Sequence, residues 1–137
     1  MARKSFVAML LSIVLIVACG GSKAATQKQY EAVTLDVKRA IEGIRHQLPK
    51  RVDEVTTLTN AYIDPGDRRK AVFVSTLSVT KDNIDPKRWQ DLGRKLRNQA
   101  CADDLFKAGI EHGYVNLLYR YIDQHDQMIG EFLINNC

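Results

Sequence analysis

The sequence lacks the residue patterns that mark most enzymes and metal sites. Its three histidines, His46, His112 and His125, lie far apart along the chain, with no spacing typical of metal ligands. No phosphate loop is present, and no nucleophile accompanies a recognisable base. Neither Cys101 nor Cys137 belongs to a Cys-x-x-Cys motif, which leaves a redox enzyme without support. We therefore expect a protein that is not an enzyme and has no cofactor, metal or small-molecule substrate.

The chain also has little net charge once its first residues are set aside. The first 18 residues hold two of the 20 basic residues and none of the 16 acidic ones, so the formal charge falls from +4 to +2 without them. A charge this small is not the signature of a nucleic-acid-binding protein. We expect no nucleic-acid partner.

No apolar run is long enough to span a membrane stably, because the longest one covers only residues 6–17. This run follows Arg3 and Lys4 and leads into Ile16-Val17-Ala18-Cys19, which has the form of a bacterial lipobox. We expect peptidase cleavage before Cys19 and lipidation of that cysteine. Several acyl chains, at roughly 0.8 kcal/mol per buried methylene, would hold the protein on a membrane permanently.

The expected organisation is a signal peptide at residues 1–18, a lipidated tether at 19–23 and a single domain at 24–137. Gly20 follows the cysteine where an aspartate would favour retention in the inner membrane, so we expect the periplasmic face of the outer membrane. The alternative is ordinary secretion with cleavage near Ser22-Lys23-Ala24, which would give a soluble periplasmic or secreted protein.

With Cys19 carrying lipid, Cys101 and Cys137 remain as a pair in an oxidising compartment. An intramolecular disulfide is the expected state, and only one pairing within the chain is available. A bridge between two chains, or a free terminal thiol, is the alternative.

Residues 24–48 carry the strongest helical pattern. An apolar stripe recurs at steps of three and four residues: Tyr30, Val33, Val37, Ile41, Ile44 and Leu48. Leu48-Pro49 then ends the helix, since proline disfavours helical geometry in the residue before it.

The rest of the chain alternates strands and helices. We expect strands over residues 51–63 and 70–80 around the turn Asp64-Pro65-Gly66-Asp67, and a helix that begins at Asp85-Pro86. This helix carries Trp89, Leu92, Leu96 and Ala100 on its inner face. A short apolar turn over 105–110 and strands over 114–122 and 128–136 follow. The order α-β-β-α-β-β predicts a two-layer α+β domain, with a four-stranded antiparallel sheet, helices on one face and one disulfide.

Several landmarks of this pattern point to a known family. They are Asn98-Gln99-Ala100-Cys101-Ala102-Asp103, Gly113-Tyr114, the strand end at 119–123 and the closing Cys137. With these landmarks the mature chain resembles the Vibrio-type pilotin lipoproteins of type II secretion over most of its length. The resemblance implies a lipidated Cys19 and a disulfide between Cys101 and Cys137. It also implies a protein partner, the C-terminal segment of a secretin subunit, which the lipoprotein carries to the outer membrane.

The chain departs from the family at Gln124-His125-Asp126, which lacks the glycine expected in a tight turn. The last hairpin could therefore be longer or differently connected. Because one fold hosts unrelated functions, a second hypothesis is an exported or secreted, virulence-associated protein that binds another envelope or host component.

Other residues carry two interpretations each. Asp103-Asp104 could chelate a cation or cap the turn that follows, and Trp89 could be a binding anchor or a core residue; we favour the cap and the core. The basic residues Arg94, Lys95 and Arg97 could contact an acidic partner or form a solvated face. Leu35, Leu118 and Leu133 lie off the main stripes, and could line a groove or pack on the opposite side of the sheet. The sequence does not identify the partner-binding residues.

Overall fold

A computed structural model describes residues 23–137. The signal peptide, Cys19 and all of the tether except Lys23 lie outside the described residues, so the expectations about them stay predictions. The elements, in chain order, are α1 (Lys23–Arg45), β1 (Lys50–Arg51), β2 (Thr56–Asp64), β3 (Asp67–Leu77), the 3-10 helix η1 (Lys81–Asn83), α2 (Pro86–Ala102), α3 (Asp104–Glu111), β4 (Asn116–Ile122) and β5 (Met128–Ile134).

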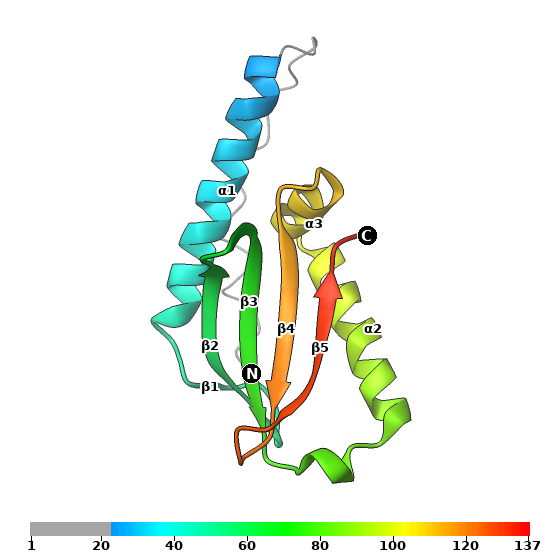
Figure 1. The fold of residues 1–137 in the computed structure, drawn as a ribbon. Helices are drawn as coiled ribbons and strands as arrows, with labels where there is room; N and C mark the ends of the chain where they lie inside the picture. The colour runs from blue at the N-terminus through cyan, green and yellow to red at the C-terminus, as the bar shows by residue number, and fades with distance from the viewer. Residues whose placement is uncertain (1–22) are drawn as a thin grey trace, which may run out of the picture.

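The strands form one five-stranded mixed sheet in the order β1-β2-β3-β4-β5 (Figure 1). Strands β3 and β4 run parallel, with Lys70 opposite Asn116 and Thr76 opposite Ile122. The other neighbours are antiparallel. The predicted four-stranded antiparallel sheet and the order α-β-β-α-β-β are therefore wrong. The direction of β4 has a simple cause: α2 and α3 carry the chain back along the sheet, so the next strand runs in the same direction as β3.

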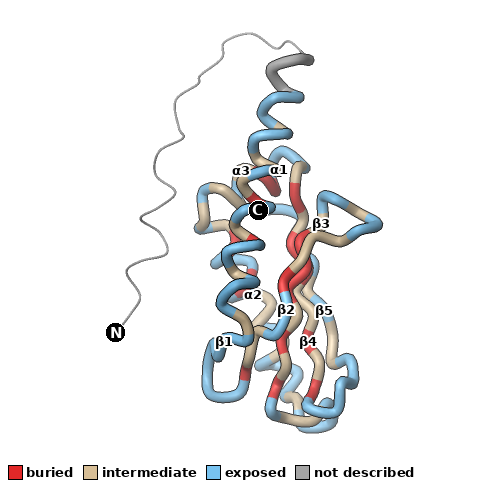
Figure 2. The backbone as a smooth tube through the Cα atoms, turned by 90° about the vertical axis from the view of Figure 1, so that its left-hand side faces the viewer, coloured by how far each residue is buried: buried red, intermediate tan, exposed pale blue. Residues whose placement is uncertain are grey.

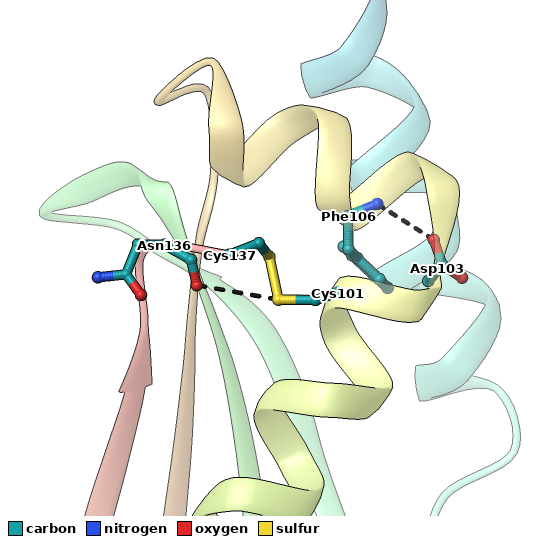
Figure 3. Close-up of a disulfide and its surroundings, with 5 residues drawn as sticks. All are labelled: Cys101, Asp103, Phe106, Asn136 and Cys137. Carbon is teal, nitrogen blue, oxygen red and sulfur yellow. Dashed lines mark hydrogen bonds between the residues drawn. A yellow bond between two sulfur atoms is a disulfide. The ribbon is translucent and has the colours of Figure 1, made fainter.

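The predicted order of elements also lacked two short elements, a strand and a helix. Strand β1 contains only Lys50 and Arg51, which pair with Thr57 and Leu58 of β2. The predicted apolar turn is instead helix α3. Asp103 caps this helix by accepting a hydrogen bond from the backbone N–H of Phe106 at 3.1 Å, which supports the capping interpretation of this residue (Figure 3).

The three helices lie on one side of the sheet (Figures 1 and 2). The stripe on α1 supplies Val37 and Ile41 to the main core, with Val33 and Ile44 packed beside them. The helix ends at Arg45, before the predicted end at residue 48, so Leu48 packs against the core from the segment that follows α1. The sheet contributes its helix-side residues, which include Ala61, Ala71, Phe73 and Leu117. The helical stripe read from the sequence is thus the buried face of α1.

Helix α2 begins as its sequence predicts. The carboxylate of Asp85 accepts a hydrogen bond from the backbone N–H of Lys87 at 2.9 Å, and Pro86 occupies the first helical position. A second core cluster then joins this helix to the sheet through Leu96, Leu77 and Tyr121, with Trp89 and Phe132 packed against them.

One disulfide joins Cys101, near the end of α2, to Cys137, the last residue (Figure 3). The two Cα atoms are 5.7 Å apart, and the cysteines are 36 positions apart in the sequence. The bridge ties the helix layer to the segment that leaves β5.

The turn between β4 and β5 forms without a glycine. Asp126 takes the left-handed conformation, with φ of 59°, which aspartate tolerates better than most residues. Asp123 is 1% exposed, and its carboxylate accepts hydrogen bonds from the backbone N–H groups of His125 and Gln127 at 2.8 and 3.0 Å. The Asp123 side chain therefore organises the turn from within.

The Asp123 carboxylate predicts a pH dependence of stability. The hydrogen bond from Gln127 lowers the pKa of Asp123 and outweighs burial, which raises it. A carboxyl whose pKa is lower in the folded state stabilises the fold above its unfolded pKa, near 4, and this contribution is lost as the pH falls through the folded pKa. Asp123→Asn keeps an oxygen acceptor but removes the charge. We expect the stability difference between wild type and Asp123→Asn, measured by guanidinium denaturation, to shrink between pH 7 and pH 2. An unchanged difference would contradict the assigned role of the charge.

Candidate partner-binding surface

The side of the sheet that faces away from the helices is open. The strand registers place alternate residues there, among them Val72, Leu118 and Leu133. Leu118 and Leu133 lie opposite each other on neighbouring strands, whereas the exposed Leu35 is on α1. Of the three surplus leucines, the structure brings two together on the open face and separates the third.

An ion pair joins β4 and β5 on this open face. The Nε atom of Arg120 on β4 donates a hydrogen bond to Oε1 of Glu131 on β5 at 2.9 Å. This bond, and interactions with Glu131 and Tyr62, raise the pKa of the Arg120 guanidinium. Val72, which lies between Tyr62 and Leu118 in the registers, is only 1% exposed although it belongs to neither core cluster. The middle of the open face is therefore covered by its own side chains.

The exposed large apolar side chains of the described residues lie in three places: Leu35 on α1, Val52 and Val55 between β1 and β2, and two residues on β5. Leu133 is 49% exposed and Met128 is 43% exposed. Both belong to the last strand in the sheet order. The β5 edge of the sheet thus carries exposed apolar side chains, whereas Val72 near the middle of the sheet does not.

Beside this edge lies an open groove of about 400 Å³ between β5 and α2. Residues 131–134 of β5 form one wall, and Gly93, Arg94 and Arg97 of α2 form the other. Arg94 contacts Asp91 at 3.6 Å, but both side chains are more than half exposed, so this ion pair holds the guanidinium only weakly. Of the three basic residues noted in the sequence, two line the groove and Lys95 does not. The groove therefore combines a basic wall with an exposed strand edge.

Two glycines bring α2 close to β5. A Cβ atom added at Gly93 would lie 2.6 Å from the Phe132 ring, and one at Gly130 would lie 2.5 Å from the indole of Trp89. Trp89 itself packs 4.4 Å from Phe132 and 5.6 Å from Tyr121, between ring centroids. The indole is thus a packing residue between α2 and the sheet. Sequence reasoning missed both glycines, although Gly130 is an isolated glycine inside a predicted strand, a place where glycine suggests a close backbone approach.

This close packing predicts the effect of Gly130→Ala. The added methyl group must displace the rigid indole of Trp89, and such overpacking costs about 1–3 kcal/mol. We expect a lower midpoint of guanidinium denaturation and a changed fluorescence spectrum, since Trp89 is the sole tryptophan. Gly43→Ala is the matched control, because a Cβ there meets nothing within 4 Å. Equal midpoints for Gly130→Ala and wild type would contradict the close approach.

The described residues carry few features of a chemical site. His46 follows α1, His112 caps the C-terminus of α3, and His125 lies in the last turn. Within residues 23–137 no group of three or more His, Cys, Asp or Glu side chains could hold a metal ion. Burial raises the pKa of Tyr119 to about 12 and also raises that of Tyr121, which makes both hydroxyls weaker acids than a solvated tyrosine. In the same part of the chain, no helix has the length and apolarity needed to cross a bilayer.

Solved structures with a similar fold include two pilotins. The pilotin EpsS of the Vibrio vulnificus type 2 secretion system is 11% identical with a TM-score of 0.60, covering 80% of this chain and 93% of its own. The type II secretion pilotin AspS of Vibrio cholerae is 13% identical with a TM-score of 0.57, covering 81% and 95%.

A third similar structure is a candidate secreted protein of Pseudomonas aeruginosa. It is 8% identical with a TM-score of 0.62, covering 85% of this chain and 96% of its own. No protein-family model and no curated protein match the chain by sequence. At such low identities the likeness concerns the fold alone: the chain has a pilotin-like fold.

Proposed function

We propose that this protein is a lipid-anchored pilotin, a partner-binding protein that carries a secretin subunit of type II secretion to the outer membrane. The observation that carries the proposal is the fold shared with EpsS and AspS, which extends over more than nine-tenths of each of those chains. An exported domain with one disulfide, an apolar strand edge and no metal cluster among its described residues suits a binding role better than catalysis.

In this proposal the two ends of the chain have separate tasks. The acylated Cys19 holds the protein in the membrane. The lipoprotein sorting pathway that delivers this anchor to the outer membrane then also delivers the partner that the domain has bound. The domain binds the C-terminal segment of the secretin subunit. The anchor is then as necessary as the binding surface, because an unanchored domain would bind its partner without delivering it.

The test is the substitution Cys19→Ala in cells that express the cognate secretin. We expect the secretin to accumulate away from the outer membrane while the domain still folds, and mass spectrometry of the wild type to find a triacylated N-terminal cysteine. Ser22→Ala is the matched control, since it changes a neighbouring residue and keeps the lipidated one. Normal secretin ring assembly after deletion of the whole protein would overturn the proposal.

A second candidate function is an exported or secreted protein that uses the same fold to bind another envelope or host component. The likeness to the candidate secreted protein of Pseudomonas aeruginosa, at a TM-score of 0.62, supports this second function. Crosslinking in intact envelopes, affinity capture and mass spectrometry of the partner separate the two. Specific recovery of a non-secretin partner supports this second function, and recovery of a secretin tail alone removes it.

A further inference from the structure

We propose that the free edge of β5 and the adjoining side of α2 form a strand-addition site, which takes an extended acidic segment of a partner as a sixth strand. Among residues 23–137, β5 has a neighbouring strand on one side only. The edge of such a strand presents backbone N–H and C=O groups that a further strand can pair with. In Figure 1, α2 lies beyond β5, where it would support an added strand from the helix side.

The two edges of the sheet differ in how well they could accept a strand. At one edge the two-residue β1 covers part of β2, which also has register shifts near Leu58 and at Ile63. At the other edge β5 pairs regularly from Gly130 to Ile134, with its shift confined to the end near Met128. Strand β5 contains no lysine or proline, the residues that commonly protect an edge, and its one charge, Glu131, is bound by Arg120. The β5 edge is therefore the accessible one.

The side chains around this edge specify the chemistry of the added strand. Successive residues of a strand point to opposite faces, so every second side chain would face α2 and the others would lie on the open face. The positions that face α2 would meet Arg94 and Arg97, whereas those on the open face would lie beside Leu133. The fitting segment thus alternates acidic and apolar residues. This inference does not depend on whether the partner is a secretin.

Two other occupants fit the groove less well. The first 30 residues of this chain contain no aspartate or glutamate, so the N-terminal segment has no acidic group to offer. In a second copy, the β5 side chains that point toward the helix layer are Phe132 and Ile134, which would meet the arginines without a countercharge. Charge complementarity therefore favours a different chain.

The first experiment measures peptide binding to the full-length protein in detergent. The probe is a fluorescent nine-residue peptide of alternating glutamate and valine, followed by anisotropy at physiological salt. We expect saturable binding that Arg97→Glu weakens about tenfold through reversal of a charge contact. Lys95→Glu, a matched control on the same helix outside the groove, should change it less than about twofold. A peptide with lysine in place of glutamate should not bind. Equal binding by both peptides, or equal effects of the two variants, overturns the proposal.

The second experiment tests backbone pairing. Two further peptides carry N-methyl groups on alternate residues, one set on the edge that would face β5 and the other on the opposite edge. Only the first set should abolish binding, and the unmodified peptide should slow hydrogen exchange of β5 amides. Binding that both peptides retain or both lose, or unaltered exchange at β5, overturns strand addition. Crosslinking of β5 to β5 between two copies in the absence of peptide assigns the edge to a homodimer and also overturns it.

Discussion

Replacing both Cys101 and Cys137 by serine is expected to lower the free energy of unfolding by about 4 kcal/mol. The disulfide closes a long loop, since the two cysteines are 36 positions apart in the sequence. In the loop-entropy account a cross-link restricts the unfolded chain, and the resulting stabilisation grows with the length of the loop. A domain of this size is stable by only about 5–15 kcal/mol, so the loss is a large share of the total.

Guanidinium denaturation of the oxidised wild type and the double variant measures this loss. Treating the wild type with a reductant should reproduce it, and the same treatment should leave the double variant unchanged. The bridge also holds the segment that follows β5, so hydrogen exchange should accelerate first at the C-terminal end of that strand. Equal midpoints for the oxidised wild type and the double variant would contradict the stabilising role.

The sequence was most informative about features that depend on a single helix. The stripe on α1 marked its buried face, because a helix shows its packing as a period of three and four residues. Asp85-Pro86 marked the start of α2 through local hydrogen bonding and a fixed backbone angle. Both signals lie within one stretch of chain and need no knowledge of distant neighbours.

Strand pairing was not predicted correctly, because it depends on which segments of the chain meet in space. Strand β1 has two residues and thus no periodicity to detect. Nothing in the strand sequences distinguishes a parallel from an antiparallel neighbour for β3, and the outcome followed from the path of α2 and α3. The length of α3, eight residues, made it resemble a turn.

Locating the candidate binding surface from the sequence would also have required knowing which strands are neighbours in the sheet. The ion pair on the open face joins Arg120 and Glu131, which come from neighbouring strands. The sequence identified Arg94 and Arg97 as basic residues of one helix and Leu133 as an apolar residue off the main stripes, but only the structure places all three beside one edge. A binding edge is a property of the whole sheet, which explains why the sequence alone did not locate it.

Replacing Trp89 by alanine is expected to lower the free energy of unfolding by about 3 kcal/mol, the lower end of the cost of removing a packed tryptophan. The indole joins α2 to the sheet through Tyr121 and Phe132, and its ring fills the space that Gly130 leaves open. Its loss leaves a cavity under the helix wall of the groove. Far-UV circular dichroism during guanidinium denaturation is the suitable measurement, because the variant has no tryptophan left.

The conservative variant Trp89→Phe gives the matched comparison, since a smaller ring keeps part of the contact with Phe132 and should lose clearly less stability. The peptide assay then separates the two interpretations of this residue. If Trp89 packs α2 onto the sheet, Trp89→Ala weakens binding only through the displaced helix, and Trp89→Phe restores much of both stability and binding. If Trp89 were a binding anchor, Trp89→Ala would abolish peptide binding and leave the denaturation midpoint unchanged. The ring contacts with two core side chains predict the first outcome.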